Sequence, residues 1–203
     1  VYFSKSADGG ATWSANVRVS AVPYDDWPDD PAIAVQPNGV IWIAWYLFYT
    51  SGSNKVNDVR LARSTDGGQT WERYTVVDGV DTNSDLWRPA IAADDARVYV
   101  LYRLRGSSGG EPGFELRLRV VDAQTLNVTT TKVSDAPVPG RVTGGLLDDG
   151  PATTLVYSNG ALCAAWEDRR SNFAIYSACS TDGGASFSPN KPASGPNAAY
   201  PVI

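Results

Sequence analysis

The sequence lacks several features that mark whole classes of protein. It has no uninterrupted run of ~18 apolar residues, which excludes a membrane-spanning helix, and no segment shows sustained helical periodicity. The net charge is −5 and no basic stripe is present, which argues against a nucleic-acid partner. No motif for a metal or a cofactor is present either, so we expect neither.

One eight-residue phrase occurs three times in the chain. It reads Ser-X-Asp-Gly-Gly-X-(Thr/Ser)-aromatic, and its aspartates are Asp8, Asp66 and Asp182. Asp8 and Asp66 are 58 residues apart, and Asp66 and Asp182 are 116 residues apart, which is twice that period. A fixed period of this size indicates a repeat architecture.

Each copy of the phrase lies between two short apolar runs, which predicts a β-hairpin turn. The Gly-Gly pair supplies the positive φ angles that such a turn needs. The aspartate side chain accepts hydrogen bonds from nearby backbone N–H groups and fixes the turn. We therefore interpret Asp8, Asp66 and Asp182 as structural residues.

The phrase resembles the Asp-box, or BNR repeat, of the sialidase superfamily. The resemblance covers essentially the whole chain and implies a β-propeller. It also implies that the boxes lie on the propeller face opposite to the active site, so the ligand-binding face is the other one.

The remaining sequence repeats in step with the boxes. Ahead of each hairpin a Pro-Ala pair opens an apolar strand, so we expect the first strands of the three blades to start at Pro31, Pro89 and Pro151. A turn follows each of them, and a second apolar strand comes next. Four strands per unit and a period near 58 predict an all-β, sialidase-like propeller with four-stranded antiparallel blades, of which this chain covers about three and a half. The expected divisions are a partial blade at 1–22, blades at 23–78, 79–136 and 137–195, and the start of another at 196–203.

The third unit has lost its box. Near residue 124 the chain retains Asp122 without the Gly-Gly pair or the aromatic residue, which we interpret as a degenerate turn. Because propeller blades do not bury their faces alone, we expect the chain to be a segment of a longer propeller. A ring closed by two copies is the alternative.

Cys163 and Cys179 are the two cysteines of the chain. They fall on adjacent strands of one blade, and a loop over residues 168–174 places them opposite each other. They form either a cross-strand disulfide or two small buried thiols. Scarce lysine and abundant Trp and Tyr favour a secreted or cell-surface protein, with a glycan or another protein as its partner.

Strand direction places the candidate ligand site at the strand ends opposite to the boxes. The residues just before the proline that opens the first strand of each blade lie nearest the propeller axis, and they are Asp30, Arg88, Gly150 and Tyr200. Trp27 and Trp87 lie close to Asp30 and Arg88. A guanidinium, a carboxylate and aromatic rings suit a polar or anionic sugar. Alternatively, Asp30 and Arg88 pair with each other and the tryptophans only pack.

A charged run, Glu167, Asp168 and Arg169, follows Trp166 on the same face. It is a second candidate for ligand binding. In the Asp-box proteins that this chain resembles, a Trp-X-Asp-X-Arg run shapes the loop between the second and third strands of a blade, and that is the alternative here.

The resemblance implies a sialidase only if the catalytic residues are present. Sialidases use three arginines, a Tyr–Glu pair and an Asp, none of which requires a histidine. Their first arginine stands in a (Tyr/Phe)-Arg-Ile-Pro phrase, whereas Trp87-Arg88-Pro89 lacks the Ile. This shifts the side chain by one strand position. We therefore favour a non-catalytic module that binds glycans or proteins or serves a structural role, with part of an exo-glycosidase that hydrolyses terminal sialic acids as the alternative.

Overall fold

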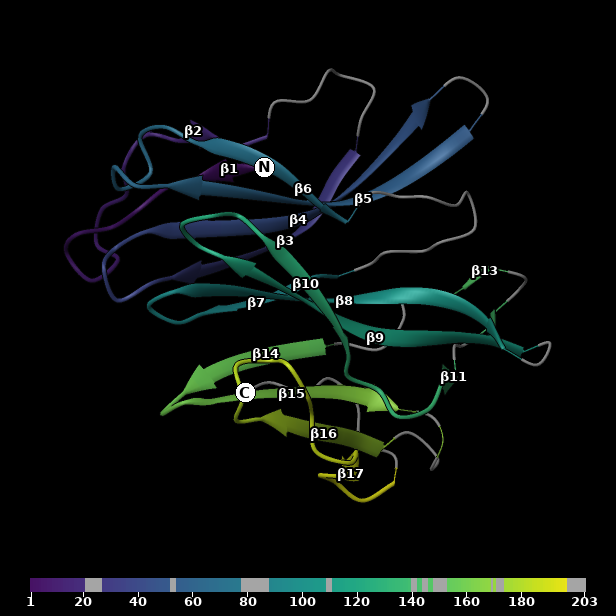
Figure 1. Cartoon of the computed structure of the whole chain (residues 1–203). Coiled ribbons are helices and arrows are strands. Elements are labelled where there is room, and N and C mark those ends of the chain that lie inside the picture. Colours follow the sequence, from purple (N-terminus) through teal and green to yellow (C-terminus); the bar gives the residue numbers. More distant parts are fainter. Residues whose placement is uncertain are drawn as a thin grey trace.

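The computed structural model describes residues 1–20, 27–51, 54–77, 88–108, 111–139, 142–143, 146–147, 153–168, 170 and 174–196. These residues form β-sheets joined by turns (Figure 1). Among them, no helix has the length and hydrophobicity needed to cross a membrane. Residues 197–203, where a further blade was expected to begin, lie outside the described part.

Three four-stranded antiparallel meanders form the body of the fold, and we call them the first, second and third blades. The first contains β3 (Trp27–Val35), β4 (Ile41–Ser51), β5 (Asn54–Ser64) and β6 (Glu72–Val77). The second contains β7 (Ala90–Ala93), β8 (Arg97–Ser108), β9 (Glu111–Asp122) and β10 (Val128–Lys132). The third contains β14 (Thr153–Ser158), β15 (Ala161–Asp168), β16 (Ala174–Ser180) and β17 (Lys191–Pro192).

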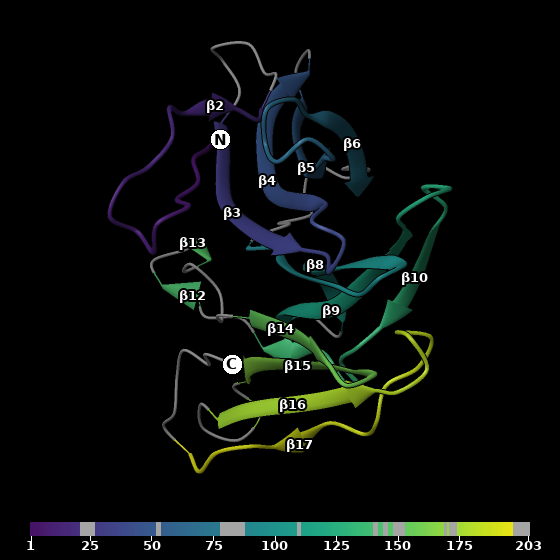
Figure 2. The same cartoon turned by 90° about the vertical axis from the view of Figure 1, so that its left-hand side faces the viewer.

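Shorter strands complete the structure. A half-blade of β1 (Tyr2–Phe3) and β2 (Val17–Arg18) precedes the first blade. β11 (Val138–Pro139) adds to β9, and β12 (Val142–Thr143) pairs with β13 (Leu146–Leu147). The sheets follow one another in an arc (Figure 2), and β7 contacts both β3 and β14. The predicted all-β fold with four-stranded blades is confirmed.

Each interface between successive sheets is an apolar cluster. Along β4, Ile41, Ile43 and Trp45 belong to the cluster on the half-blade side, whereas Trp42 and Ala44 belong to the cluster shared with the second blade. Because both faces of the strand are covered, apolar residues occupy consecutive positions instead of alternating ones. This explains the continuous apolar runs in the sequence.

The first blade begins earlier than the sequence pattern predicts. We expected its first strand to start at Pro31, but β3 starts at Trp27 and has a register shift between Asp29 and Ala32. β3 is an edge strand, so its prolines need not donate a hydrogen bond to a second neighbour. The bulge absorbs Pro31 and lets pairing with β4 continue toward Trp27.

The three boxes close the β1–β2, β5–β6 and β16–β17 turns with the same set of hydrogen bonds. In the second box, Asp66 Oδ1 accepts from Thr70 N at 3.0 Å and from Ser64 Oγ at 2.8 Å, and Asp66 Oδ2 accepts from Thr70 Oγ1 at 2.5 Å. Ser64 Oγ also accepts from Gly68 N at 2.8 Å. Asp8 and Asp182 repeat this arrangement.

The box glycines also leave room for side chains of the preceding sheet. Gly68 has a φ of 90°, and a Cβ on it would lie 2.1 Å from Cε1 of Phe3 on β1. Gly184 has a φ of 86°, and its Cβ would lie 2.8 Å from Cδ2 of Leu118 on β9. Lys5 Nζ adds a hydrogen bond to the carbonyl oxygen of Gly67 at 2.8 Å. The absent side chains thus leave the space in which one blade packs against the next.

The degenerate turn of the second blade keeps part of the hydrogen-bond pattern of the boxes. Asp122 Oδ1 accepts from Gln124 N at 3.0 Å and from Thr125 N at 2.7 Å. Leu126 has a φ of 61° and packs against the cluster between the first and second blades. A leucine therefore takes the left-handed conformation and fills the interface with its own side chain.

Cys163 and Cys179 are directly opposite each other on β15 and β16, with a Cα–Cα separation of 4.1 Å, and they form a disulfide. Of the two alternatives, the structure contains the cross-strand bond. It lies in the third blade and joins its two central strands.

Gly68 and Gly10 provide a matched test of blade packing. Both have positive φ angles, of 90° and 95°, but a Cβ on Gly10 meets nothing within 4 Å. Alanine at either site incurs a backbone cost of roughly 1–2 kcal/mol. Gly68→Ala adds overpacking of roughly 1–3 kcal/mol, because the Phe3 ring is held by Trp71 at 5.4 Å. We expect Gly68→Ala to lower the melting temperature clearly more than Gly10→Ala, and equal losses would contradict the packing role.

Asp66→Asn tests the box carboxylate across pH. Hydrogen bonds from Thr70, then from Ser64, hold the pKa of Asp66 well below its usual range. A depressed folded-state pKa stabilises the protein above the unfolded-state pKa of about 3.9, and this contribution is lost as the pH falls toward the folded-state value. We expect Asp66→Asn to lower the melting temperature at pH 7 by roughly 2–8 °C and to flatten its decline in acid. Asp95→Asn, in an exposed turn, is the control; identical acid profiles for wild type and Asp66→Asn would refute the role.

Candidate functional site

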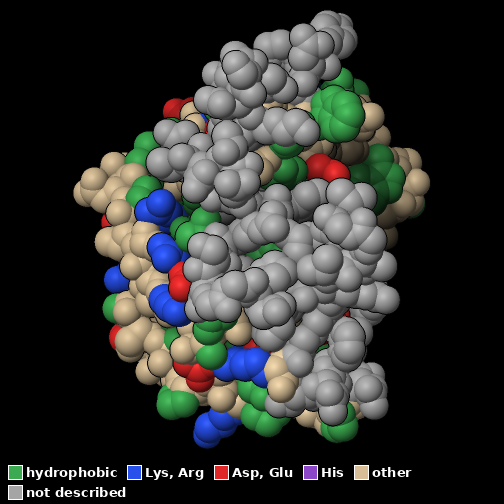
Figure 3. Space-filling model, turned by 90° about the vertical axis from the view of Figure 1, so that its right-hand side faces the viewer, with side chains coloured by type: hydrophobic (Ala, Val, Ile, Leu, Met, Phe, Trp, Pro, Cys, Tyr) green, Lys and Arg blue, Asp and Glu red, His purple; other side chains and the backbone are tan. Residues whose placement is uncertain are grey.

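The face opposite to the boxes carries the candidate site, and we call it the top face. The box turns lie at the left of Figure 1, and the β4–β5 and β8–β9 hairpins extend to the right. Figure 3 views the molecule from that right-hand side, where acidic side chains adjoin hydrophobic ones. The starts of β3 and β7 lead onto this face.

Asp30 and Arg88 occupy equivalent positions before the prolines of the first and second blades. Asp30 Oδ1 and Arg88 Nε lie 4.0 Å apart, with side-chain exposures of 28% and 34%. Their φ angles are 49° and 51°, a left-handed conformation that is uncommon for residues other than glycine. The proline after each one restricts its backbone further. Two strained residues that face each other across a blade junction mark a candidate functional site.

Neighbouring blades hold this pair in place. Thr153 Oγ1, at the start of β14, donates a hydrogen bond to the carbonyl oxygen of Arg88 at 3.2 Å. Asp29 Oδ1 accepts from Asp30 N at 2.8 Å. The third blade thus contacts the backbone of Arg88, and the first blade fixes the backbone of Asp30.

The electrostatics of Asp30 reflect opposing effects. Partial burial, and then the negative charge of Asp29, raises the pKa of Asp30, while Arg88 and Arg103 act in the opposite direction. Arg103 is 1% exposed, and its guanidinium lies 5.2 Å from the centroid of the Phe114 ring. The site therefore combines a half-buried carboxyl group, a half-buried guanidinium and a second guanidinium beneath them.

Sequence reasoning did not single out Arg103. The available signal was a charged residue at the end of the apolar run that includes Val100, Leu101 and Tyr102. A buried arginine in such a run needs compensating contacts, and here the Phe114 ring supplies one of them. Its influence on Asp30 depends on how β3 and β8 come together.

Trp27 lies at the start of β3 and is 71% exposed. It is directly paired with Phe48 on β4, and the two ring centroids are 6.4 Å apart. Trp87, the other tryptophan of the predicted site, lies outside the described residues, as do Gly150 and Tyr200. The structure thus places Trp27, Asp30 and Arg88 on the same face.

The charged run of the third blade makes hydrogen bonds and ion pairs within the protein. Asp168 is fully buried and accepts from Trp166 Nε1 at 3.1 Å and from Arg170 Nε at 2.9 Å. Arg170 then bridges to Asp135 at 2.7 Å. These contacts favour the loop-shaping alternative for Asp168. Glu167 is 5% exposed, and Arg169 lies outside the described residues.

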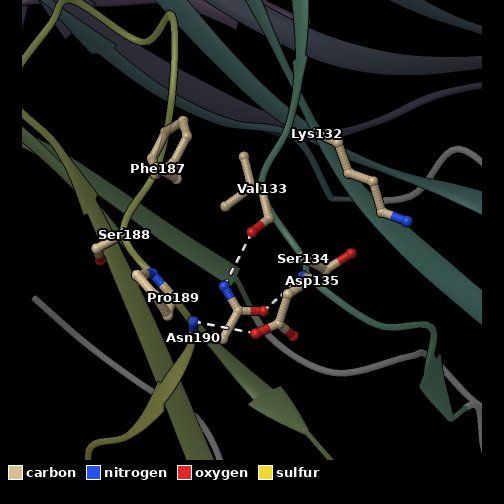
Figure 4. Close-up of a pocket in the computed structure, with 8 residues that line it drawn as sticks. All are labelled: Lys132, Val133, Ser134, Asp135, Phe187, Ser188, Pro189 and Asn190. Carbon is tan, nitrogen blue, oxygen red and sulfur yellow. Dashed lines mark hydrogen bonds between the residues drawn. The ribbon is translucent and has the colours of Figure 1, made fainter.

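A pocket of about 380 Å³ lies between the ends of the second and third blades, and Asp135, the partner of Arg170, forms part of its wall (Figure 4). Asn190 spans its wall by donating from Nδ2 to the carbonyl oxygen of Val133 at 3.0 Å and by accepting at Oδ1 from Asp135 N at 2.7 Å. These polar groups are satisfied by each other, so the pocket is a blade junction and we do not assign it a ligand.

The comparisons with known proteins support the fold. Residues 62–73 match the family model of the BNR/Asp-box repeat. Among solved structures, the chain is similar to a Dyadobacter fermentans protein of unknown function, with a TM-score of 0.61 and 18% identity over 94% of this chain and 57% of that one. The chain thus contains a match to the Asp-box repeat, and its four-stranded blades share the fold of the solved structure.

Two sugar-processing enzymes are also similar in structure. The Penicillium chrysogenum α-L-arabinanase complexed with arabinobiose has a TM-score of 0.54, with 18% identity over 86% of this chain and 50% of the enzyme. The Trypanosoma rangeli sialidase complexed with sialic acid has a TM-score of 0.52, with 16% identity over 79% of this chain and 30% of the enzyme. This chain thus spans 57%, 50% and 30% of the length of these three solved structures, respectively. No curated protein matches its sequence.

The protonation of Asp30 tests the geometry of the pair. Burial raises the pKa of Asp30 and Arg88 opposes this rise, so we expect its carboxyl group to titrate above the usual value of about 3.9. Removing the guanidinium in Arg88→Ala raises the pKa further. Carbon-detected NMR titration of both proteins measures this, with Asp182, whose pKa is lowered by hydrogen bonds from Ser186 and Ser180, as the internal reference. An Asp30 midpoint that does not move in Arg88→Ala would refute the pairing.

Proposed function

We propose that this chain is part of a secreted, non-catalytic propeller that binds carbohydrate at the Asp30–Arg88 pair on its top face. The observation that carries the proposal is the left-handed conformation of both residues at the junction of two blades. Such strain persists where surrounding structure enforces it, and it concentrates at ligand sites.

The chemistry of the pair suits sugar hydroxyl groups. The carboxylate accepts hydrogen bonds, and the guanidinium donates several in a planar fork. Both side chains are about a third exposed, so a ligand reaches them without prior rearrangement. The similar arabinanase and sialidase structures contain sugars, which supports a carbohydrate in preference to a protein ligand.

Binding without hydrolysis is favoured by how the acidic residues are used. Most glycoside hydrolases need two cooperating carboxyl groups. Of the buried aspartates on described strands, Asp168 is tied to Arg170, and Asp58 is paired with Arg60 at 2.5 Å. Asp30 itself lies beside Arg88, so the positive charge of this guanidinium is partly compensated within the protein.

The disulfide supports the proposed location. Disulfides form and persist in oxidising compartments such as the extracellular space. The Cys163–Cys179 bond is therefore consistent with secretion or display at the cell surface.

One observation favours exo-glycosidase activity as a second candidate. A carboxyl group whose pKa is raised by burial, as for Asp30, is a candidate acid or base. A sialidase-like hydrolase that acts on terminal sialic acids would use it on this same face.

Calorimetric titration with α-1,5-arabinobiose and 3′-sialyllactose tests the proposal. We expect measurable binding to at least one sugar and a loss of about tenfold or more in affinity for Asp30→Asn and for Arg88→Gln, because each removes one charged partner. Asp95→Asn is the control. Absence of binding to both sugars would contradict the function.

Catalysis is measured in parallel with a fluorogenic sialoside and a chromogenic arabinofuranoside. The non-catalytic proposal expects no release from either substrate. Release that disappears in Asp30→Asn would instead establish the hydrolase.

A further inference from the structure

Trp27 differs from the other large apolar side chains that the described residues expose. Tyr2 and Trp13 belong to the half-blade, Ile33 and Val35 lie farther along β3, and Val128 opens β10. Trp27 stands at the top-face end of β3, on the same strand as Asp30. At 71% exposed, its indole offers most of its surface at the end of the strand that carries Asp30.

The indole is braced at one side. Trp27 and Phe48 form a direct cross-strand pair, and their rings are tilted by 52° with centroids 6.4 Å apart. Phe48 packs against the cluster between the first and second blades. Cross-strand aromatic pairs are stabilising, so Phe48 supports the Trp27 ring while most of the ring's surface remains in solvent.

The spacing along β3 relates this ring to the polar pair. Three residue steps separate Trp27 from Asp30, and a strand advances about 3.3 Å per residue, so their backbones are up to about 10 Å apart. That distance exceeds the width of a single sugar ring. A ligand of two linked sugar rings is long enough to contact both positions.

We propose that Trp27, braced by Phe48, is a stacking platform for a second sugar ring, and that the ligand of this face is an oligosaccharide. One ring contacts Asp30 and Arg88 through its hydroxyl groups, and the apolar C–H face of a linked ring lies on the indole. Ligand sites commonly combine aromatic walls with a few polar groups that fix orientation. This inference rests on the proposed carbohydrate function and adds the ligand's length.

The test compares short and long sugars by calorimetry. The probes are L-arabinose against α-1,5-arabinotriose, and N-acetylneuraminic acid against 3′-sialyllactose. We expect the wild type to bind the longer member of one pair about tenfold or more tightly. Trp27→Ala loses this advantage, and Trp27→Phe, which keeps an aromatic face, retains part of it.

Trp13→Ala is the matched control, because Trp13 is 66% exposed but lies in a box turn on the opposite face. Trp13→Ala retains the full advantage of the longer sugar. Thermal melts of each variant confirm that the fold persists.

The outcomes separate the two levels of the proposal. Wild-type binding that is equal for short and long sugars, or a Trp27→Ala variant that keeps the advantage, overturns the platform while the carbohydrate function stands. Failure of the wild type to bind any probe overturns both.

Discussion

The hydrogen bonds to the box aspartate are the constraint from which the packing of the blades follows. The Asp66 carboxylate accepts from two backbone N–H groups and two hydroxyl groups, and this holds two consecutive glycines at positive φ. Only glycine takes that conformation without a steric cost. The same absence of a Cβ opens the space that Phe3 of the preceding sheet enters. The same glycines therefore both close the hairpin and set the spacing between two blades.

The space beside each box turn is filled by a different side chain of the preceding sheet. Phe3 fills it in the half-blade, and Leu118 fills it in the second blade. In the first blade Arg63 instead lies 5.7 Å from the Trp42 ring and donates to the carbonyl oxygen of Ala123 at 2.9 Å, while Leu126 supplies the apolar bulk from the far side. Trp42 and Arg63 are directly paired across β4 and β5, as Cys163 and Cys179 are across β15 and β16. In the third blade a covalent bond thus takes the place of a contact between an arginine and an aromatic ring.

What could be predicted from sequence was local or periodic. The box turns follow from neighbouring residues, and the cysteine pairing follows from the two-residue period of antiparallel strands. The early start of β3 could not be predicted, because it depends on a β-bulge between Asp29 and Ala32 that contains Pro31. The position of Arg103 under Asp30 was also hidden, since it depends on how two blades pack. The sequence pattern brought Asp30 and Arg88 together, but not their left-handed backbones, which the surrounding blades enforce.

The box face stabilises the fold, whereas the top face carries the proposed binding site. On the box face, polar groups of the turn satisfy each other, and the positive φ angles of the intact boxes fall on glycine, where they cost little. On the top face, positive φ falls on Asp30 and Arg88, where it costs of order 1–3 kcal/mol each. A chain this size has only a modest margin of stability, so strain there requires a well-packed scaffold elsewhere. The apolar clusters between the blades, set by the box glycines, provide that scaffold, and the charged pair is thereby held in an orientation that an unstrained strand would not give it.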